Sequence, residues 1–270
     1  CYTSGTTGNP RGVVYSHRAL VLQALNMVGA LELTCRDTIL PIVPMFHVNG
    51  WTLPFVSTLL GNKLVMPGKD LDGASVYQLL NEEKVTFSAG VPTVWLMLLN
   101  YLQKYELALP FLKKILIGGS AAPLSMLETF SKNYDVEPMQ GWGMTETSSM
   151  GTGPSITAGV LQGGDSAVLN ARLKQGRAIF GIEMKIINDN GNILPRDGKS
   201  QGHLCIRGWA VANSYFKLND RASFLDDGWF ETGDIATIDG DGYMQLTDRS
   251  KDMIKSGGEW ISSIDLENTA

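Results

Sequence analysis

The sequence is poor in the two residue types that most often build metal centres and covalent cross-links. Its 270 residues contain three cysteines and three histidines, scattered along the chain as Cys1, Cys35, Cys205, His17, His47 and His203. No two cysteines have the C-x-x-C spacing and no histidine lies near a cysteine cluster, so neither a zinc site nor a disulfide framework is predicted. We interpret the cysteines as reduced thiols of a cytoplasmic protein, and we expect any metal to be bound through oxygen.

Long apolar runs and concentrated positive charge are missing as well. No uncharged apolar segment reaches the ~18 residues that a membrane span requires, which leaves peripheral contact with a membrane open. The net charge is −5, and the basic residues neither form a block nor alternate with aromatics, so no nucleic-acid partner is expected. The chain starts on Cys1 instead of Met and opens without a signal-like segment, so we expect a fragment of a longer protein.

The first half of the sequence has the pattern of an α/β protein. Up to about residue 135, short apolar runs alternate with stretches of helical period, as in a mostly parallel sheet layered with helices. The predicted strands are residues 38–43, 63–66, 85–88 and 115–117. The predicted crossover helices are residues 16–33, 72–83 and 92–102, the first with Leu20, Ala24, Val28 and Leu31 on one face.

After about Gly151 the sequence changes to turn signals and short alternating runs. Residues 189–192 and 239–242 suit hairpin turns, so we expect a small antiparallel β subdomain. The acidic turn at 239–242 could suggest calcium, but it lacks the other ligands and the terminal Glu of such a loop. We therefore predict three parts: an α/β part at 1–150, a β-rich part at 151–248, and a hinge with the start of a further domain at 249–270.

Residues 3–12 have the composition of a phosphate-binding loop. Three glycines permit close backbone approach, four hydroxyls and the backbone N–H groups can donate to phosphate oxygens, and Arg11 adds a fixed positive charge. The segment does not follow the G-x-x-x-x-G-K-[ST] pattern. Taken alone, it is equally well explained as a flexible turn rich in Ser, Thr and Gly.

Two later segments could complete a nucleotide site. An apolar strand runs into the small residues 118–123, and Trp142 then stands between glycines, followed by Thr145 and Glu146. An aromatic plane can stack on adenine and a carboxylate can hold magnesium, although Trp142 alone is better explained as a core residue. Asp234, after a tight turn, is a candidate for ribose hydroxyls, whereas the charged run 248–259 alone would be a solvated surface.

Taken in order, five segments closely resemble the adenylate-forming superfamily of acyl-CoA synthetases, luciferases and peptide-synthetase adenylation domains. The segments are residues 3–12, 118–123, 141–146, 231–234 and 248–258, and the likeness covers essentially the whole chain. The resemblance implies an enzyme that uses ATP and Mg²⁺ to convert a carboxylic acid to an acyl-adenylate and then transfers the acyl group to coenzyme A. It is compatible with a homodimer.

The resemblance also assigns roles to individual residues. The nucleotide-binding residues it implies are Thr3, Ser4, Gly5, Thr6, Thr7, Gly8, Arg11, Gly119, Ser120, Ala121, Gly141, Trp142, Gly143, Met144, Thr145, Asp234 and Arg249. Glu146 would hold the magnesium, and Thr3, Thr145, Glu146 and His47 would be the catalytic set, with His47 beside the acyl and pantetheine channel. Lys251 would be the hinge between half-reactions, and Ser256, Gly257 and Gly258 would lie along the approach of coenzyme A.

Within the superfamily, residues 46–51, 71–75 and 88–95 look most like medium-chain fatty-acyl-CoA ligases and methylmercaptopropionate-CoA ligases. An aliphatic acid of medium or long chain is therefore expected, with Trp51, Val91 and Trp95 as candidate walls of its channel. Two alternatives remain: an adenylating enzyme that uses a carrier protein as acceptor, and a nucleotide-binding module without catalysis.

Two features depart from the family pattern. Arg11 stands where the family usually has Lys, which exchanges a point charge for a planar fork. The chain ends at Ala270, before the domain that carries the family's catalytic lysine, and it lacks the part that precedes the phosphate loop. We expect this fragment alone to be inactive.

Overall fold

The protein is described here from a computed structural model, which defines residues 1–3, 9–218, 223–249, 254–256 and 259–261. Its larger sheet has five parallel strands in the order β2-β1-β3-β4-β5. These strands are β1 (Thr38–Pro41), β2 (Lys63–Leu64), β3 (Phe87–Gly90), β4 (Lys114–Ile117) and β5 (Glu137–Gln140). The predicted α/β class, with a mostly parallel sheet, is confirmed.

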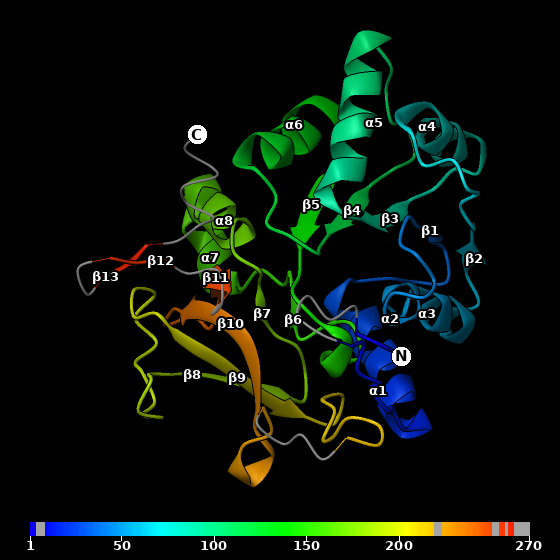
Figure 1. Ribbon diagram of the computed structural model, residues 1–270. Helices are drawn as coiled ribbons and strands as arrows, with labels where there is room; N and C mark the ends of the chain where they lie inside the picture. Colours follow the sequence, from blue (N-terminus) through cyan, green and yellow to red (C-terminus); the bar gives the residue numbers. More distant parts are fainter. Residues whose placement is uncertain (4–8, 219–222, 250–253, 257–258, 262–270) are drawn as a thin grey trace.

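Helices cover both faces of this sheet (Figure 1). The helices are α1 (His17–Ala30), α2 (Val48–Trp51), α3 (Leu53–Leu60), α4 (Gly73–Glu82), α5 (Pro92–Lys104) and α6 (Leu124–Tyr134). Successive strand residues point to opposite faces: Leu116 belongs to the core shared with α1 and α3, whereas its neighbours Ile115 and Ile117 belong to the core under α4, α5 and α6. Burial on both faces explains why the predicted strands are continuous apolar runs.

Local signals position several of these helices. The Ser16 side chain accepts a hydrogen bond from the Ala19 N–H at 3.0 Å and caps the start of α1. Asp72 caps α4 in the same way through Ala74, and Pro92 occupies the first turn of α5, where its missing N–H is not needed. These helices were predicted from their apolar periodicity, and the predicted bounds agree with the observed ones within a few residues.

Three details of the prediction were wrong. The strand predicted at 85–88 begins two residues later, because the Val85 N–H donates to Leu80 O and closes the end of α4. Strand β5 was not predicted; it contains Pro138 and lies at an edge of the described sheet, where Pro is tolerated.

The third wrong detail of the prediction concerns helix α1. No strand of this sheet precedes it within the described residues, so it is not a crossover helix. It does bury Ala24 and is followed by the buried Leu31, but Gln23 and Met27 complete the buried face in place of Leu20 and Val28.

The second half of the chain adds a four-stranded antiparallel sheet in the order β11-β10-β9-β8. Its strands are β8 (Ile182–Ile187), β9 (Gly202–Gly208), β10 (Phe230–Ile238) and β11 (Met244–Arg249). The remaining elements are the short 3₁₀ helices η1 (Thr145–Thr147) and η2 (Asp226–Gly228), the helices α7 (Ala158–Gln162) and α8 (Gly164–Arg172), and the strand pairs β6 (Thr152–Gly153) with β7 (Arg177–Ala178) and β12 (Ile254–Ser256) with β13 (Glu259–Ile261). The predicted antiparallel part is confirmed, but α7 and α8 were not foreseen.

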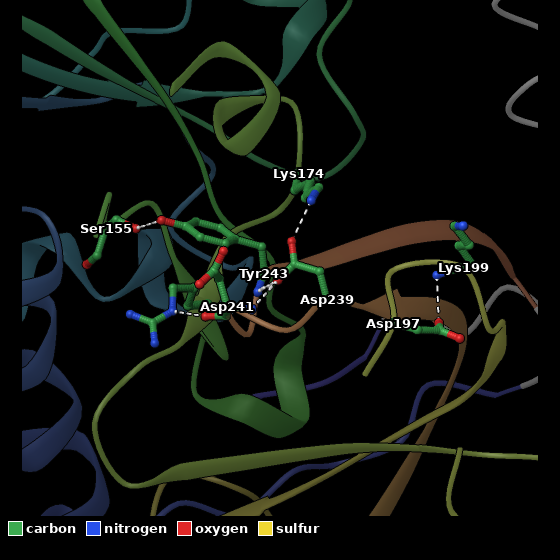
Figure 2. Close-up of polar contacts among 8 residues, drawn as sticks. Ser155, Lys174, Asp197, Lys199, Asp239, Asp241 and Tyr243 are labelled. Atoms are coloured by element: carbon green, nitrogen blue, oxygen red, sulfur yellow. Dashed lines mark hydrogen bonds and ion pairs between the residues drawn. The ribbon is translucent and has the colours of Figure 1, made fainter. Parts of the chain in front are cut away.

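The acidic turn at 239–242 is a hairpin turn between β10 and β11, as predicted. The Asp239 carboxylate accepts hydrogen bonds from the Asp241 and Tyr243 N–H groups and forms an ion pair of 2.5 Å with Lys174 (Figure 2). Tyr243 is buried, and its hydroxyl donates to Ser155 O at 3.1 Å. The carboxylate thus already serves to fix the turn.

The two sheets share one of the two buried clusters. That cluster contains residues of α1, β1 and β4 together with residues of β8, β9 and β10, so apolar packing continues across residue 150. None of the helices in the described ranges is long and apolar enough to cross a membrane. The predicted boundaries at 150 and 248 stay predictions.

Candidate active site

The segments that were predicted to bind the nucleotide and the acid follow the carboxyl ends of the parallel strands. The loop with His47 follows β1, Val91 follows β3, Gly118 to Ala122 follow β4, and Gly141 to Glu146 follow β5. Ligands of open α/β sheets bind in the crevice beyond these strand ends. The fold therefore collects four separate sequence segments at one edge.

A small cavity of about 50 Å³ marks this edge. Five predicted site residues line it: His47, Gly119, Gly141, Trp142 and Gly143. The other lining residues are Met27, Val48, Trp51, Leu116, Gly118, Ser149 and Met150. The structure thus brings together His47 of the predicted acyl motif and residues of the segments 118–123 and 141–146.

Part of the wall of this cavity is formed by close contact between the Trp51 ring and the backbone of Gly118. A methyl group on Gly118 would lie 2.9 Å from the Trp51 ring, so the ring packs directly on this glycine. Trp51, predicted as a wall of the acyl channel, does line the cavity. Trp95 does not: it is fully buried in the other core, its indole N–H donates to Gly90 O at 3.1 Å, and its ring meets Phe130 edge-on.

Trp51 is held by an unusual backbone segment. Residues 48–52 all have positive φ, from 43° at Val48 to 63° at Thr52. Such a run of left-handed residues is strained unless its surroundings impose it. One constraint is the Thr52 hydroxyl, which lies 2.8 Å from the Ser149 hydroxyl and donates to Ser148 O at 3.1 Å.

The loop after β4 is fixed by a buried glutamine. Gln140 Oε1 accepts from the Ala122 N–H at 2.9 Å, while Gln140 Nε2 donates to Arg172 O at 2.9 Å and Leu173 O at 3.3 Å. Ser120 and Ala121, just before Ala122, are exposed. Gln140 thus anchors the predicted adenine loop at Ala122, while the residues before it are accessible to a ligand.

Trp142 lies in the core and also at the cavity, and its contact with adenine stays a prediction. It is only 7% exposed and packs against Gly151, where a methyl group would lie 2.6 Å from the ring, so it belongs to the core. It also lines the cavity, and its indole Nε1 donates to Asp234 Oδ2 at 3.0 Å. This hydrogen bond joins the predicted adenine residue to the predicted ribose residue on β10.

Glu146 is a buried carboxylate at the start of a tight turn. It lies in η1 with 4% exposure, and its Oε1 accepts from the Tyr215 hydroxyl at 2.7 Å. Thr145, also buried, accepts at its carbonyl oxygen a hydrogen bond of 2.5 Å from the Tyr15 hydroxyl. Burial first, and then the negative charge of Glu146, raise the pKa of Tyr15 above its usual value.

The two ends of the predicted phosphate loop are joined to each other. Thr3 N–H donates to Arg11 O at 2.9 Å, and the Thr3 hydroxyl accepts from the Arg11 N–H at 3.2 Å. The Arg11 guanidinium lies 5.0 Å from the centre of the Tyr215 ring. Five of the predicted phosphate ligands, Ser4, Gly5, Thr6, Thr7 and Gly8, lie outside the described residues.

The remaining predicted residues belong to the end of the chain. Asp234 on β10 and Arg249 on β11 are directly opposed in the antiparallel ladder, and their shared role at the ribose stays a prediction. Ser256 lies on β12, and Lys251, Gly257 and Gly258 are outside the described residues.

The residues present fit a magnesium ion that is bound together with phosphates. Within the described residues, no group of three or more His, Cys, Asp or Glu side chains could hold a metal alone. Magnesium in nucleotide enzymes is commonly held by one or two carboxylates plus substrate phosphates and water. A single buried carboxylate, Glu146, linked through Tyr215 to the flank of a phosphate loop matches that donor set.

Sequence reasoning missed the residues that hold the site together, namely Tyr15, Gln140 and Tyr215. Gln140 directly precedes the predicted segment 141–146 and ends a parallel strand, a position that often lies at a ligand site, so this signal could have been used. Tyr15 and Tyr215 carry no such signal, because their partners lie 130 and 69 residues away in the sequence.

Comparison with known proteins agrees with this geometry. A medium-chain-fatty-acid–CoA ligase of Ectopseudomonas oleovorans is 50% identical, and a 3-methylmercaptopropionyl-CoA ligase of Ruegeria pomeroyi is 48% identical, each over 100% of this chain and 50% of its own length. The O-succinylbenzoate coenzyme A synthetase of Bacillus subtilis, solved with ATP and a magnesium ion, superimposes with a TM-score of 0.82 at 29% identity, over 98% of this chain and 53% of that one.

The chain therefore spans about half the length of the curated relatives it matches. The family model of AMP-binding enzymes matches residues 1–216. On the strength of that match and of the geometry at the strand ends, the chain belongs to the AMP-binding enzyme family.

Proposed function

We propose that the full-length protein containing this chain is an AMP-forming acyl-CoA ligase. The observation that carries the proposal is the contact among predicted motifs: Gly119 and Trp142 line one cavity, Trp142 is hydrogen-bonded to Asp234, and Tyr215 joins Arg11 to the buried Glu146. Carboxylate and triphosphate repel each other, so such an enzyme must supply orientation and positive charge.

In the proposed first half-reaction, the substrate carboxylate attacks the α-phosphate of ATP and pyrophosphate leaves. The loop from Thr3 to Arg11 holds the phosphates, with Thr145 beside them. Trp142 and the residues 119–121 contact the adenine, and Asp234 with Arg249 holds the ribose. Glu146 would hold the magnesium ion, which when bound neutralises charge on the phosphates.

In the proposed second half-reaction, the thiol of coenzyme A attacks the acyl-adenylate and AMP leaves. His47, on the cavity wall, would lie beside the acyl and pantetheine channel. Lys251 would be the hinge that exchanges the two active conformations, and Ser256, Gly257 and Gly258 would border the approach of coenzyme A.

The substrate is proposed to be an aliphatic acid of medium or long chain. Trp51 contributes an apolar wall to the cavity, and Val91 lies close to Gly119, where a methyl group would be 3.1 Å from the Val91 side chain. By its name, the relative from Ectopseudomonas oleovorans acts on medium-chain fatty acids. We further propose a cytoplasmic location with reduced thiols, and a homodimer remains compatible with this function.

One assay on the full-length protein tests the function. Acids of graded chain length are supplied with ATP, Mg²⁺ and coenzyme A, and the thioester and AMP are measured. We expect kcat/KM to rise with chain length, since each buried methylene contributes roughly 0.8 kcal/mol, until the channel is full. A better aryl acid would overturn the substrate class.

Pyrophosphate exchange and ATP binding, measured on the same full-length protein, separate the alternatives. Acid-dependent pyrophosphate exchange that never becomes dependent on coenzyme A would favour a carrier-protein acceptor. ATP binding without any acid-dependent exchange would favour a module without catalysis.

A further inference from the structure

A short segment after β9 connects the flank of the phosphate loop to the turn that carries Glu146. The Ala212 N–H donates to Glu146 O at 2.7 Å, and the Phe216 N–H donates to Gly12 O at 2.7 Å. Residues 210–216 therefore bridge two predicted parts of the nucleotide site that are more than a hundred residues apart in the sequence. Tyr215 lies between these two attachment points.

Tyr215 contacts both parts through its side chain as well. It is 6% exposed, its hydroxyl donates to Glu146 Oε1 at 2.7 Å, and the Arg11 guanidinium lies 5.0 Å from its ring centre. Its backbone forms a bridge with Val13, directly after the loop. One side chain thus touches the predicted metal ligand and the predicted phosphate-binding cation.

We propose that Tyr215 is a positioning residue for MgATP: its hydroxyl sets the orientation of the Glu146 carboxylate, and its ring seats the Arg11 guanidinium. The inference rests on the proposed function of Glu146. Tyr215 itself touches neither metal nor phosphate in this assignment, and it acts through the two groups it holds.

The physical reason is the strict geometry of magnesium. Mg²⁺ requires near-ideal octahedral coordination, so a carboxylate that can rotate binds it poorly. A hydrogen bond to one carboxylate oxygen leaves the other in a defined direction, and loss of such an outer partner typically costs about 10- to 100-fold in metal affinity or activity.

The hydroxyl is well suited to remain a donor. Burial first, and then its hydrogen bond to Glu146, raise the pKa of Tyr215 above its usual value, with Arg11 acting in the opposite direction. A phenol, with an ordinary pKa of ~10, is protonated at neutral pH without this shift, so the donor role rests on the contact itself. The other nearby phenol, Tyr15, donates to the Thr145 backbone instead of the carboxylate.

The contact to Arg11 depends on the guanidinium. A planar guanidinium can lie flat on an aromatic ring while its edge donates to phosphate, which an ammonium group cannot do in the same way. Arg11, which replaces the family's usual Lys, thus has an aromatic partner in Tyr215.

The test is Tyr215→Phe in the full-length protein, which keeps the ring and removes the hydroxyl. Tyr243→Phe is the matched control, because it also removes a buried hydroxyl, one that donates to Ser155 O (Figure 2) and accepts from the Thr157 N–H, and neither partner is a predicted nucleotide residue. Two quantities are measured: the Mg²⁺ concentration for half-maximal acid-dependent pyrophosphate exchange, and the Mg²⁺ concentration at which ATP raises the melting temperature.

We expect Tyr215→Phe to raise both Mg²⁺ midpoints by roughly 10-fold or more, with near-normal exchange at saturating Mg²⁺, and Tyr243→Phe to leave both unchanged. Unchanged midpoints in Tyr215→Phe, or an equal rise in the control, would overturn the inference. If Tyr215→Phe does not fold, the pair Tyr215→Gln and Tyr215→Leu compares a donor with none. Both variants lose the ring, so we expect Leu to raise the midpoints further than Gln, and equal midpoints would overturn the inference.

The melting measurement keeps this inference separate from the proposed function. It reports MgATP binding even if the wild-type protein shows no acid-dependent exchange. Absent exchange in the wild type therefore counts against the proposed function, whereas a normal Mg²⁺ midpoint for ATP in Tyr215→Phe counts against the role of Tyr215.

Discussion

Replacing Gln140 by Glu is the sharpest perturbation of the loop after β4. The wild-type amide has 3% exposure, accepts from the Ala122 N–H, and donates to two carbonyl oxygens, Arg172 O at 2.9 Å and Leu173 O at 3.3 Å. A glutamate has nearly the same shape. When ionised, however, it faces those two carbonyl oxygens with no proton between them.

The magnitude follows from burial. A fully buried Glu can have its pKa raised by about 3 to 5 units, and each unit corresponds to ~1.36 kcal/mol. A rise of about 3 units above the ordinary ~4.3 makes the ionised variant ~4 kcal/mol less stable than the neutral one. Because the folded variant then binds more protons than the unfolded chain, its stability falls as pH rises from about 4 to about 7 and then levels off.

The assay is urea unfolding of variant and wild type, followed by tryptophan fluorescence at about pH 5 and about pH 8. The control is Gln103→Glu, since Gln103 is exposed on α5 and the change introduces the same charge without burial. We expect the penalty of Gln140→Glu to grow by a few kcal/mol between these pH values while the control stays flat. A penalty independent of pH, or a control with the same slope, would refute the reasoning.

Three further outcomes are expected. Glu146→Ala should lower acid-dependent pyrophosphate exchange by about two to three orders of magnitude, and near-normal exchange would remove Glu146 from the magnesium site. Trp142→Phe keeps a ring but loses the 3.0 Å hydrogen bond to Asp234, so urea unfolding should show a loss of at least ~1.5 kcal/mol, and no loss would contradict the contact. Gly143→Ala would place a methyl carbon 1.7 Å from Ser149 O, so we expect loss of ATP binding or a large fall in the yield of folded protein. ATP binding and yield equal to those of the wild type would show that the close packing of Gly143 on the Ser149 backbone is not required.

The parts of the fold that the sequence predicts are those with local causes. Strand β4 was expected because Ile115 to Ile117 form a buried run that stops at two glycines, and α5 because Pro92 starts an apolar helical period. Strand β5 depended on knowing that Pro138 would stand at a sheet edge, which only the assembled strand order reveals.

The site residues also divide into those with a local signal in the sequence and those that only the folded chain brings together. Glycines, hydroxyls and carboxylates at strand ends are visible in the sequence because they interrupt apolar runs, and Trp142 could be assigned to both core and ligand. The contact of Tyr215 with Glu146 could not be predicted, because it joins residues 69 apart through a long side chain and no local periodicity specifies that meeting.

The left-handed turn at residues 48–52 lowers the folding stability of the protein but fixes the position of Trp51 at the cavity. A non-glycine residue held at positive φ costs about 1–3 kcal/mol, and Val48 is β-branched, for which such a φ is least favourable. Glycine at this position would relieve the cost, yet it would also loosen the backbone that keeps Trp51 against Gly118. Substitutions that relieve this cost are therefore expected to make the protein more heat-resistant and, under the proposed function, to weaken the selection between acids of different length.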